Sequence, residues 1–176
     1  FTPIYKYSFC IAQDGKDYFQ LGRIARTLDE LIDNGEMEPI LFFGIPYKTV
    51  AERHIKYHPK GEKTRNYQRF LAYELVPFIQ KHYPVVDNPS GRALAGDSLA
   101  ATISLMTALQ YPDIFGKVML HSPYVDELVL EQVDNFTEWS KINIYHVIGT
   151  LETAVHMTDG NTADFLSLNR QLSTKL

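Results

Sequence analysis

The segment from Arg92 to Leu105 constrains the fold more than any other part of this 176-residue chain. A short apolar run leads into Gly96-Asp97-Ser98, and a helical pattern of small residues follows at once. A strand that turns so sharply into a helix requires a glycine, because a Cβ at that point would clash with the turn. The segment therefore predicts a strand–turn–helix unit with the Ser98 side chain exposed at its tip.

The residues around Ser98 form the pattern Gly-x-Ser-x-Gly of a nucleophile elbow, with Ala100 in place of the second glycine. The replacement is mild, since alanine has the next smallest side chain. In such a turn the first N–H groups of the helix point at the group that the serine attacks and stabilise a developing oxyanion. A serine before an apolar run is also a common helix N-cap, so these five residues alone leave both interpretations open.

Apolar runs alternate with helical patterns along the chain, which is typical of a parallel sheet covered by helices. Strands are expected at 8–13, 39–45, 91–95, 117–121 and 142–148, and helices at 18–34, 66–83, 98–110, 127–139 and from 164 onward. Pro77 should kink its helix or reset the register, because it lacks an N–H. The basic segment 50–64 is interpreted as a surface excursion with a solvated charged face, with contact to the substrate as the less favoured alternative. The pattern predicts an α/β fold with a mostly parallel, doubly wound sheet and the elbow strand in its middle.

Several polar or turn-forming residues follow directly after the expected strands: Asp14-Gly15, Pro46, Ser98, Ser122 and Glu152. The carboxyl ends of the strands in a doubly wound sheet form the edge that holds the binding site. The sequence therefore predicts a site at this edge.

Composition excludes several classes of protein. A net charge of −4 gives no reason to expect nucleic acid or an anionic membrane as a partner. No apolar run approaches the roughly 20 residues of a membrane span. Cys10 is the one cysteine; it lies in an apolar run, which predicts a buried, inert thiol and favours a cytoplasmic location. No His-x-x-x-His pair and no phosphate-binding glycine loop is expected near the site, so neither a metal nor a cofactor is predicted.

Four motifs, in order, resemble the esterase D and enterochelin-esterase-like family of α/β-hydrolases, which includes feruloyl esterases and mycolyltransferases. The motifs are Ala12–Gly15 (Gln-Asp-Gly after an early strand), Phe70–Ile79 (Phe-Leu-x-x-Glu-Leu-x-Pro-x-Ile), Gly96–Ala100 (the elbow) and Tyr111–Phe115 (Tyr-Pro-x-x-Phe). The resemblance implies an α/β-hydrolase fold for residues 1–176 as a single domain. That domain is expected to lack N-terminal strands and the C-terminal strand with its histidine loop.

The resemblance also implies roles for individual residues. Ser98 would be the nucleophile, and the backbone N–H groups of Leu99 and Gly15 would form the oxyanion hole. The acid follows the serine in the chain order of this fold. Glu152, just after the fifth strand, is the first candidate for it, and Asp159, which also fits a surface turn, is the second.

The catalytic histidine is not identified by the sequence. The family places it after one further strand, in a Gly-x-His-like loop, which is expected beyond Leu176. His156 follows Glu152 by only four residues, and His121 precedes the acid and is expected to be packed or hydrogen-bonded. An altered dyad that uses His121 or His156 stays open. The remaining histidines have no support beyond their residue type: His54, His58, His82 and His146.

The resemblance implies a serine esterase that hydrolyses small-molecule carboxylic esters through an acyl-serine intermediate, without a cofactor. Two alternatives stay open: a non-catalytic, hydrolase-like binding protein and an acyltransferase that uses the same nucleophile. Neither the ester nor the oligomeric state is predicted.

Overall fold

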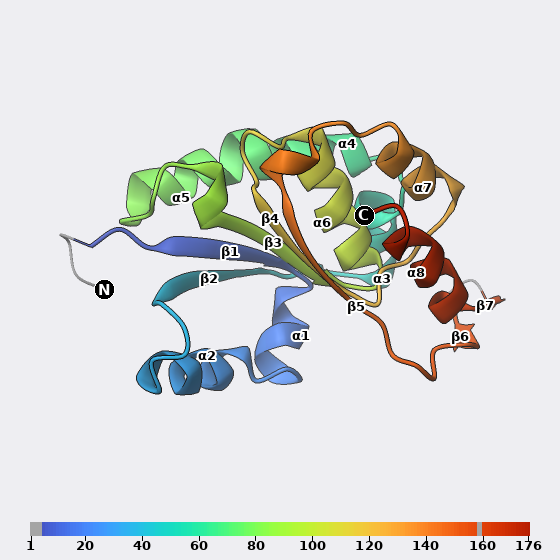
Figure 1. Ribbon diagram of the computed structural model, residues 1–176, viewed down its shortest axis with the longest axis horizontal. Coiled ribbons are helices and arrows are strands. Elements are labelled where there is room, and N and C mark those ends of the chain that lie inside the picture. The colour runs from blue at the N-terminus through green and yellow to red at the C-terminus, as the bar shows by residue number, and fades with distance from the viewer. Residues whose placement is uncertain (1–4, 158–159) are drawn as a thin grey trace.

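The computed structural model describes residues 5–157 and 160–176. Its centre is a five-stranded parallel sheet in the order β2-β1-β3-β4-β5 (Figure 1). The strands are β1 Ser8–Gln13, β2 Ile40–Ile45, β3 Arg92–Asp97, β4 Lys117–His121 and β5 Asn143–Val147. The predicted parallel sheet, with the elbow strand in the middle, is confirmed. The strand order reverses between β1 and β3, which is where ligands bind in doubly wound sheets.

Helices cover both faces of the sheet (Figure 1). On one side lie α1 Gly15–Gln20 and α2 Ile24–Asp33, and on the other α3 Val50–Tyr57, α4 Thr64–Phe70, α5 Val76–His82, α6 Leu99–Gln110 and α7 Glu127–Asp134. The chain ends with α8 Phe165–Ser173, after a two-stranded hairpin of β6 Val155–His156 and β7 Thr162–Ala163 that the sequence did not predict. None of the described helices has the length and apolarity needed to span a membrane.

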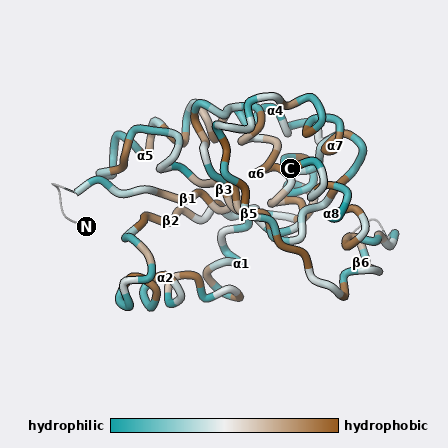
Figure 2. Tube along the Cα trace, viewed as in Figure 1, coloured by the Kyte–Doolittle hydropathy of each residue, from teal (hydrophilic) through white to brown (hydrophobic). Residues whose placement is uncertain are grey.

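The main core lies between the sheet and α6. Small residues such as Ala100 and Ala101 are fully buried and allow α6 to approach β3 and β4 closely. Ser104 Oγ donates a hydrogen bond to the Ala95 carbonyl at 3.1 Å, which ties the helix to the elbow strand. Apolar residues concentrate along the strands in Figure 2. The position of Ser98 is thus fixed by a rigid, buried strand and helix.

The opposite face of the sheet holds a smaller cluster around Cys10, against which Tyr18 and Phe42 pack. Burial raises the pKa of the Cys10 thiol to about 12, so the predicted inert thiol is confirmed. Farther along this face Met119 and Tyr145 are exposed.

Three of the predicted helices differ in the structure, and the simplest case is the one expected at 127–139, which ends at Asp134. The helix expected at 18–34 is divided into α1 and α2, because the chain turns at Gly22 and at Arg23, whose φ is 50°. The helix expected at 66–83 is continuous but contains a π-helical turn, Leu71–Leu75, directly before Pro77. The wider turn resets the hydrogen-bond register, as expected from a proline that cannot donate.

The interpretation of segment 50–64 as a solvated excursion is wrong. Its first half forms α3, which packs against α4 and α6. Tyr57 is only 1% exposed, and Arg53 forms an ion pair whose side chains are largely buried. The segment belongs to the wall of the candidate site.

Candidate active site

Ser98 lies at the turn between β3 and α6 with φ 56° and ψ −124°, a conformation that residues other than glycine rarely adopt. Backbone hydrogen bonds hold the turn on both sides. Ser98 N–H donates to the His121 carbonyl at 3.0 Å, and the Ser98 carbonyl accepts from Thr102 N–H at 3.1 Å and from Tyr124 N–H at 3.3 Å. The strained backbone is therefore fixed, and Ser98 lines a cavity of about 140 Å³.

The cavity beside Ser98 is walled by α3, the β6–β7 hairpin and the start of α8. Its lining residues are Arg53, His54, His58, Ser98, Leu99, Tyr124, Val155, His156, Met157 and Phe165. Three of the ten are histidines, and several others are aromatic or apolar. The cavity can thus hold a small, partly apolar group beside Ser98.

His54 and His58 were missed by the sequence analysis. His54 lies on α3 and His58 directly follows its last residue, four positions on, and their rings stack at a centroid distance of 4.4 Å. The expectation that no His-x-x-x-His pair lies near the site is wrong. The four-residue spacing of these histidines was visible in the sequence. The lysines around them favoured the interpretation of a solvated surface segment instead. Even so, no group of three or more His, Cys, Asp or Glu in residues 5–157 and 160–176 is arranged to hold a metal ion.

Gly15 and Leu99 follow the ends of the adjacent strands β1 and β3, whose register pairs Ala12 with Ala95. Leu99 is the first residue of α6, and Gly15 is the first residue of α1. A Cβ on Gly15 would lie 2.2 Å from the Gly44 carbonyl carbon, so only glycine allows this close approach to β2. The two backbone N–H groups expected to form an oxyanion hole are thus brought to the same end of neighbouring strands.

Glu152 follows β5 and is half-buried. Its Oε1 accepts hydrogen bonds from Ser122 Oγ at 2.7 Å and from Gly149 N–H at 2.8 Å. These bonds hold the carboxylate at the carboxyl edge of the sheet, near enough to Asp97 for its charge to raise the pKa of that residue. No hydrogen bond joins Glu152 to a histidine within the described residues. The second acid candidate, Asp159, lies outside the residues that the structure describes.

The histidines named from the sequence lie in different settings. His121, at the end of β4, is hydrogen-bonded through Nδ1 to the Tyr18 hydroxyl at 2.9 Å, as expected, and burial lowers its pKa. His156 is exposed, lines the Ser98 cavity and lies 3.3 Å from Thr162 Oγ1. His82 bonds to the Phe78 carbonyl, and His146 bonds to Asn169.

Asp97, directly before Ser98 in the chain, has a pKa above that of an ordinary aspartate. Asp97 is the exposed last residue of β3, but partial desolvation by the protein around it raises its pKa to about 6; Arg53 opposes this shift, and the nearby Asp14 and Glu152 carboxylates add to it. An unfolded aspartate has a pKa of about 3.9, so the folded protein binds this proton more tightly than the unfolded chain does. Stability therefore falls as the pH rises from about 4 to about 6, and the loss persists at higher pH.

Asp97→Asn removes this charge and is expected to raise Tm at a pH of about 7.5, where Asp97 is ionised. At a pH of about 3.5, where both folded and unfolded forms are protonated, it should give no such gain. Thermal unfolding followed by circular dichroism at the two pH values measures the difference. Asp29→Asn, at an exposed position on α2, is the control. An equal change in Tm at both pH values would contradict the prediction.

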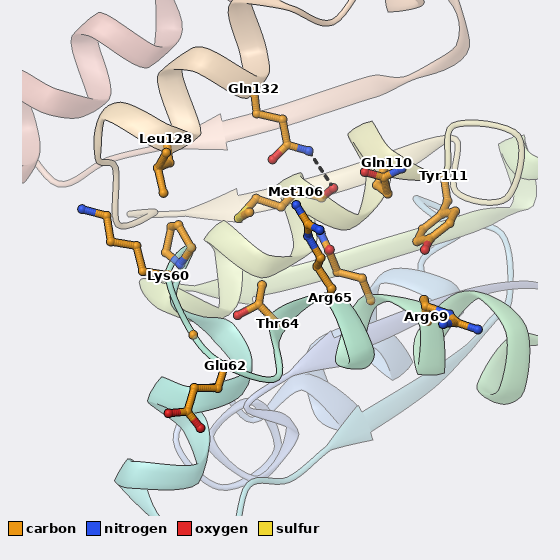
Figure 3. A pocket seen from close by; sticks show the side chains of 13 residues that line it. Lys60, Glu62, Thr64, Arg65, Arg69, Met106, Gln110, Tyr111, Leu128 and Gln132 are labelled. Atoms are coloured by element: carbon orange, nitrogen blue, oxygen red, sulfur yellow. Dashed lines mark hydrogen bonds between the residues drawn. The ribbon is translucent and has the colours of Figure 1, made fainter.

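A second, larger cavity of about 660 Å³ lies between α4, α6 and α7 and shares no lining residue with the Ser98 cavity (Figure 3). Gln132 Nε2 donates to the Met106 carbonyl at 3.2 Å across it. Figure 3 shows Lys60 and Arg69 pointing away from each other. Lys60 and Arg69 thus do not converge, and no serine or histidine lines this cavity.

Comparison with known proteins agrees with this geometry. A family model described as "Putative esterase" matches residues 1–176. A Bacillus subtilis (strain 168) protein described as "Uncharacterized protein YjcH" is 52% identical over 176 residues, which are 100% of this chain and 73% of that protein. The iron(III) salmochelin esterase of Escherichia coli O6:H1 is 28% identical over 115 residues, 64% of this chain and 27% of that protein.

Solved structures share the fold. The enterochelin esterase of Shigella flexneri superposes with a TM-score of 0.81 at 17% identity, over 97% of this chain and 43% of that one. The BES protein of Bacillus cereus gives a TM-score of 0.76 at 20% identity, over 97% of this chain and 69% of that one. The chain thus spans less than half of the Shigella enzyme. Because the family model matches along its whole length, the chain belongs to the putative esterase family.

Proposed function

We propose that this protein is a serine esterase that hydrolyses small-molecule carboxylic esters through an acyl-serine intermediate. The observation that carries the proposal is the backbone of Ser98, held in a strained conformation between β3 and α6 at a position that lines a cavity. Strain of this kind persists only where the surrounding structure enforces it, and it is concentrated at functional sites. Membership of the esterase family supports the same chemistry.

In the proposed reaction the Ser98 hydroxyl attacks the carbonyl carbon of the ester while a histidine takes its proton. The tetrahedral oxyanion accepts hydrogen bonds from the N–H groups of Leu99 and Gly15. Its collapse breaks the bond to the alcohol, which leaves with the proton from the histidine. Water then attacks the acyl-serine in the same manner and releases the acid. Main-chain donors supply the charge stabilisation, so the mechanism uses no cofactor.

Within this chain His121 and His156 are the candidates for the base, and of the two His156 lines the Ser98 cavity. The Shigella flexneri enzyme was crystallised in the presence of enterobactin, and an Escherichia coli relative is a salmochelin esterase. Aromatic residues that line the cavity, among them Tyr124 and Phe165, support an ester with a planar group as the substrate.

A fluorophosphonate probe tests the proposal directly. The protein is incubated with the probe and digested, and the labelled peptide is identified by mass spectrometry. Label on Ser98 is the expected result, and an unlabelled Ser98 in the full chain would favour the non-catalytic alternative. Product analysis with competing alcohols separates hydrolysis from acyl transfer.

Glu152→Gln tests the proposed acid. Glutamine keeps an oxygen that can accept from Ser122 and Gly149, so the loop should keep its structure while the negative charge is lost. Loss of a triad acid lowers kcat by about 10⁴-fold in a serine hydrolase, and a similar fall is expected in p-nitrophenyl acetate hydrolysis. Asp159→Asn is the matched control and should stay within about threefold of the unaltered protein. The opposite order of effects would assign the acid to Asp159.

A further inference from the structure

Arg53 links the two turns that contain the proposed oxyanion donors. Its Nε and Nη2 lie 2.8 Å and 2.6 Å from Asp14 Oδ2, in an ion pair whose side chains are 16% and 6% exposed. The same Nη2 donates to the Asp97 carbonyl at 3.2 Å. One guanidinium group is therefore bonded to the residue before Gly15 and to the residue before Ser98.

Buried hydroxyl groups extend this link into the core. Tyr57, one turn after Arg53 on α3, packs its ring against that of Tyr67 at a centroid distance of 5.2 Å. The Tyr67 hydroxyl donates in turn to Gln13 Oε1. Gln13, Tyr57 and Tyr67 are each no more than 6% exposed. Hydrogen bonds in such a buried network reinforce one another, so the network fixes α3 against the end of β1.

The conformation of Asp14 shows why the turn needs support. Asp14 has φ 57° and ψ 38°, in the left-handed region that disfavours most side chains. The direction of the following N–H group, that of Gly15, depends on these angles. The ion pair with Arg53 fixes the Asp14 side chain while the neighbouring strand β2 packs against Gly15.

We propose that Arg53 is a positioning residue that holds the Gly15 and Leu99 N–H groups at the spacing needed to bind one oxyanion. The inference rests on the proposed function. The planar guanidinium bonds in two directions at once, to a carboxylate and to a carbonyl, whereas the ammonium group of lysine acts as a point charge. A displacement of about 1 Å in such donors is enough to slow catalysis by about 100-fold.

The main test is the double variant Arg53→Met/Asp14→Asn, because Arg53→Met alone leaves a buried, unpaired carboxylate that endangers folding. We expect kcat for p-nitrophenyl acetate to fall about 100-fold, with KM changed by less than about threefold, because binding survives and transition-state stabilisation is lost. The single variant Arg53→Lys, which keeps the charge, should show a smaller fall in kcat than the double variant. Arg26→Met, which breaks the exposed Arg26–Glu30 ion pair on α2, is the control and should leave kcat unchanged.

Hydrogen–deuterium exchange provides a readout that does not depend on activity. Amide exchange in the peptide that contains Gly15 should become faster in the double variant and stay unchanged in the control. A double variant that keeps kcat within about threefold, or that loses activity with unchanged exchange at Gly15, overturns the positioning role of Arg53 but leaves the proposed esterase intact. An unaltered protein that neither hydrolyses the ester nor reacts with the probe overturns the proposed function itself.

Discussion

Ser98→Ala is expected to lower kcat/KM for p-nitrophenyl acetate by at least about 10⁴-fold, as the loss of a nucleophile does in serine hydrolases. Binding and the oxyanion donors cannot replace the attacking oxygen. The fold should be unaffected, because no described residue forms a hydrogen bond with Ser98 Oγ, and the backbone bonds of the turn involve only main-chain atoms of this residue. We therefore expect a nearly unchanged Tm together with a large loss of activity.

Esterase assays on both proteins, with circular dichroism to confirm folding, measure this effect. Ser140→Ala, at an exposed position between α7 and β5, is the matched control and should keep full activity and full labelling by a fluorophosphonate. If Ser98→Ala is folded and hydrolyses the ester as fast as the control, another residue is the nucleophile.

The parts of the fold that the sequence predicted well depend on local chemistry. The bounds of β1 and β4 agree with the predicted ranges, because each strand is an apolar run ended by polar or turn-forming residues. The Ser98 turn was equally local, since Gly96 and the small residues after it are adjacent in the chain. The structure gives these elements the predicted order in one parallel sheet.

The parts that could not be predicted depend on residues far apart in the sequence. Arg53 lies 39 positions from Asp14, so a local pattern of charges could not show that its guanidinium is buried. His54 and His58 reach the Ser98 cavity only because α3 packs against α6. The Glu152 bond to Ser122 likewise joins loops 30 residues apart. Tertiary packing, rather than local propensity, builds this wall of the site.

Gly96→Ala is expected to have the largest effect on stability. Gly96 is buried in β3, and a Cβ there would lie 2.1 Å from the Ala100 carbonyl carbon and 2.5 Å from Ala101 N. Both are backbone atoms in the first turn of α6, so no side-chain rotation relieves the clash. Overpacking of a rigid core costs about 1–3 kcal/mol. Because α6 must move as a unit, we expect the free energy of unfolding to fall by about 3 kcal/mol. Urea unfolding followed by circular dichroism measures it.

Gly35→Ala separates this clash from the general cost of replacing a glycine. Gly35 has φ 72° with no atom within 4 Å of an added Cβ, so the variant introduces backbone strain without contact. That strain costs about 1–2 kcal/mol, and since Gly35 follows α2, away from Ser98, esterase activity should be retained. Gly96→Ala should instead lose activity even under conditions in which it stays folded, because displacement of α6 moves the Leu99 N–H away from the oxyanion. Equal stabilities for the two variants, with activity kept in both, would mean that the close approach of β3 to α6 is not what holds Ser98 in its strained conformation.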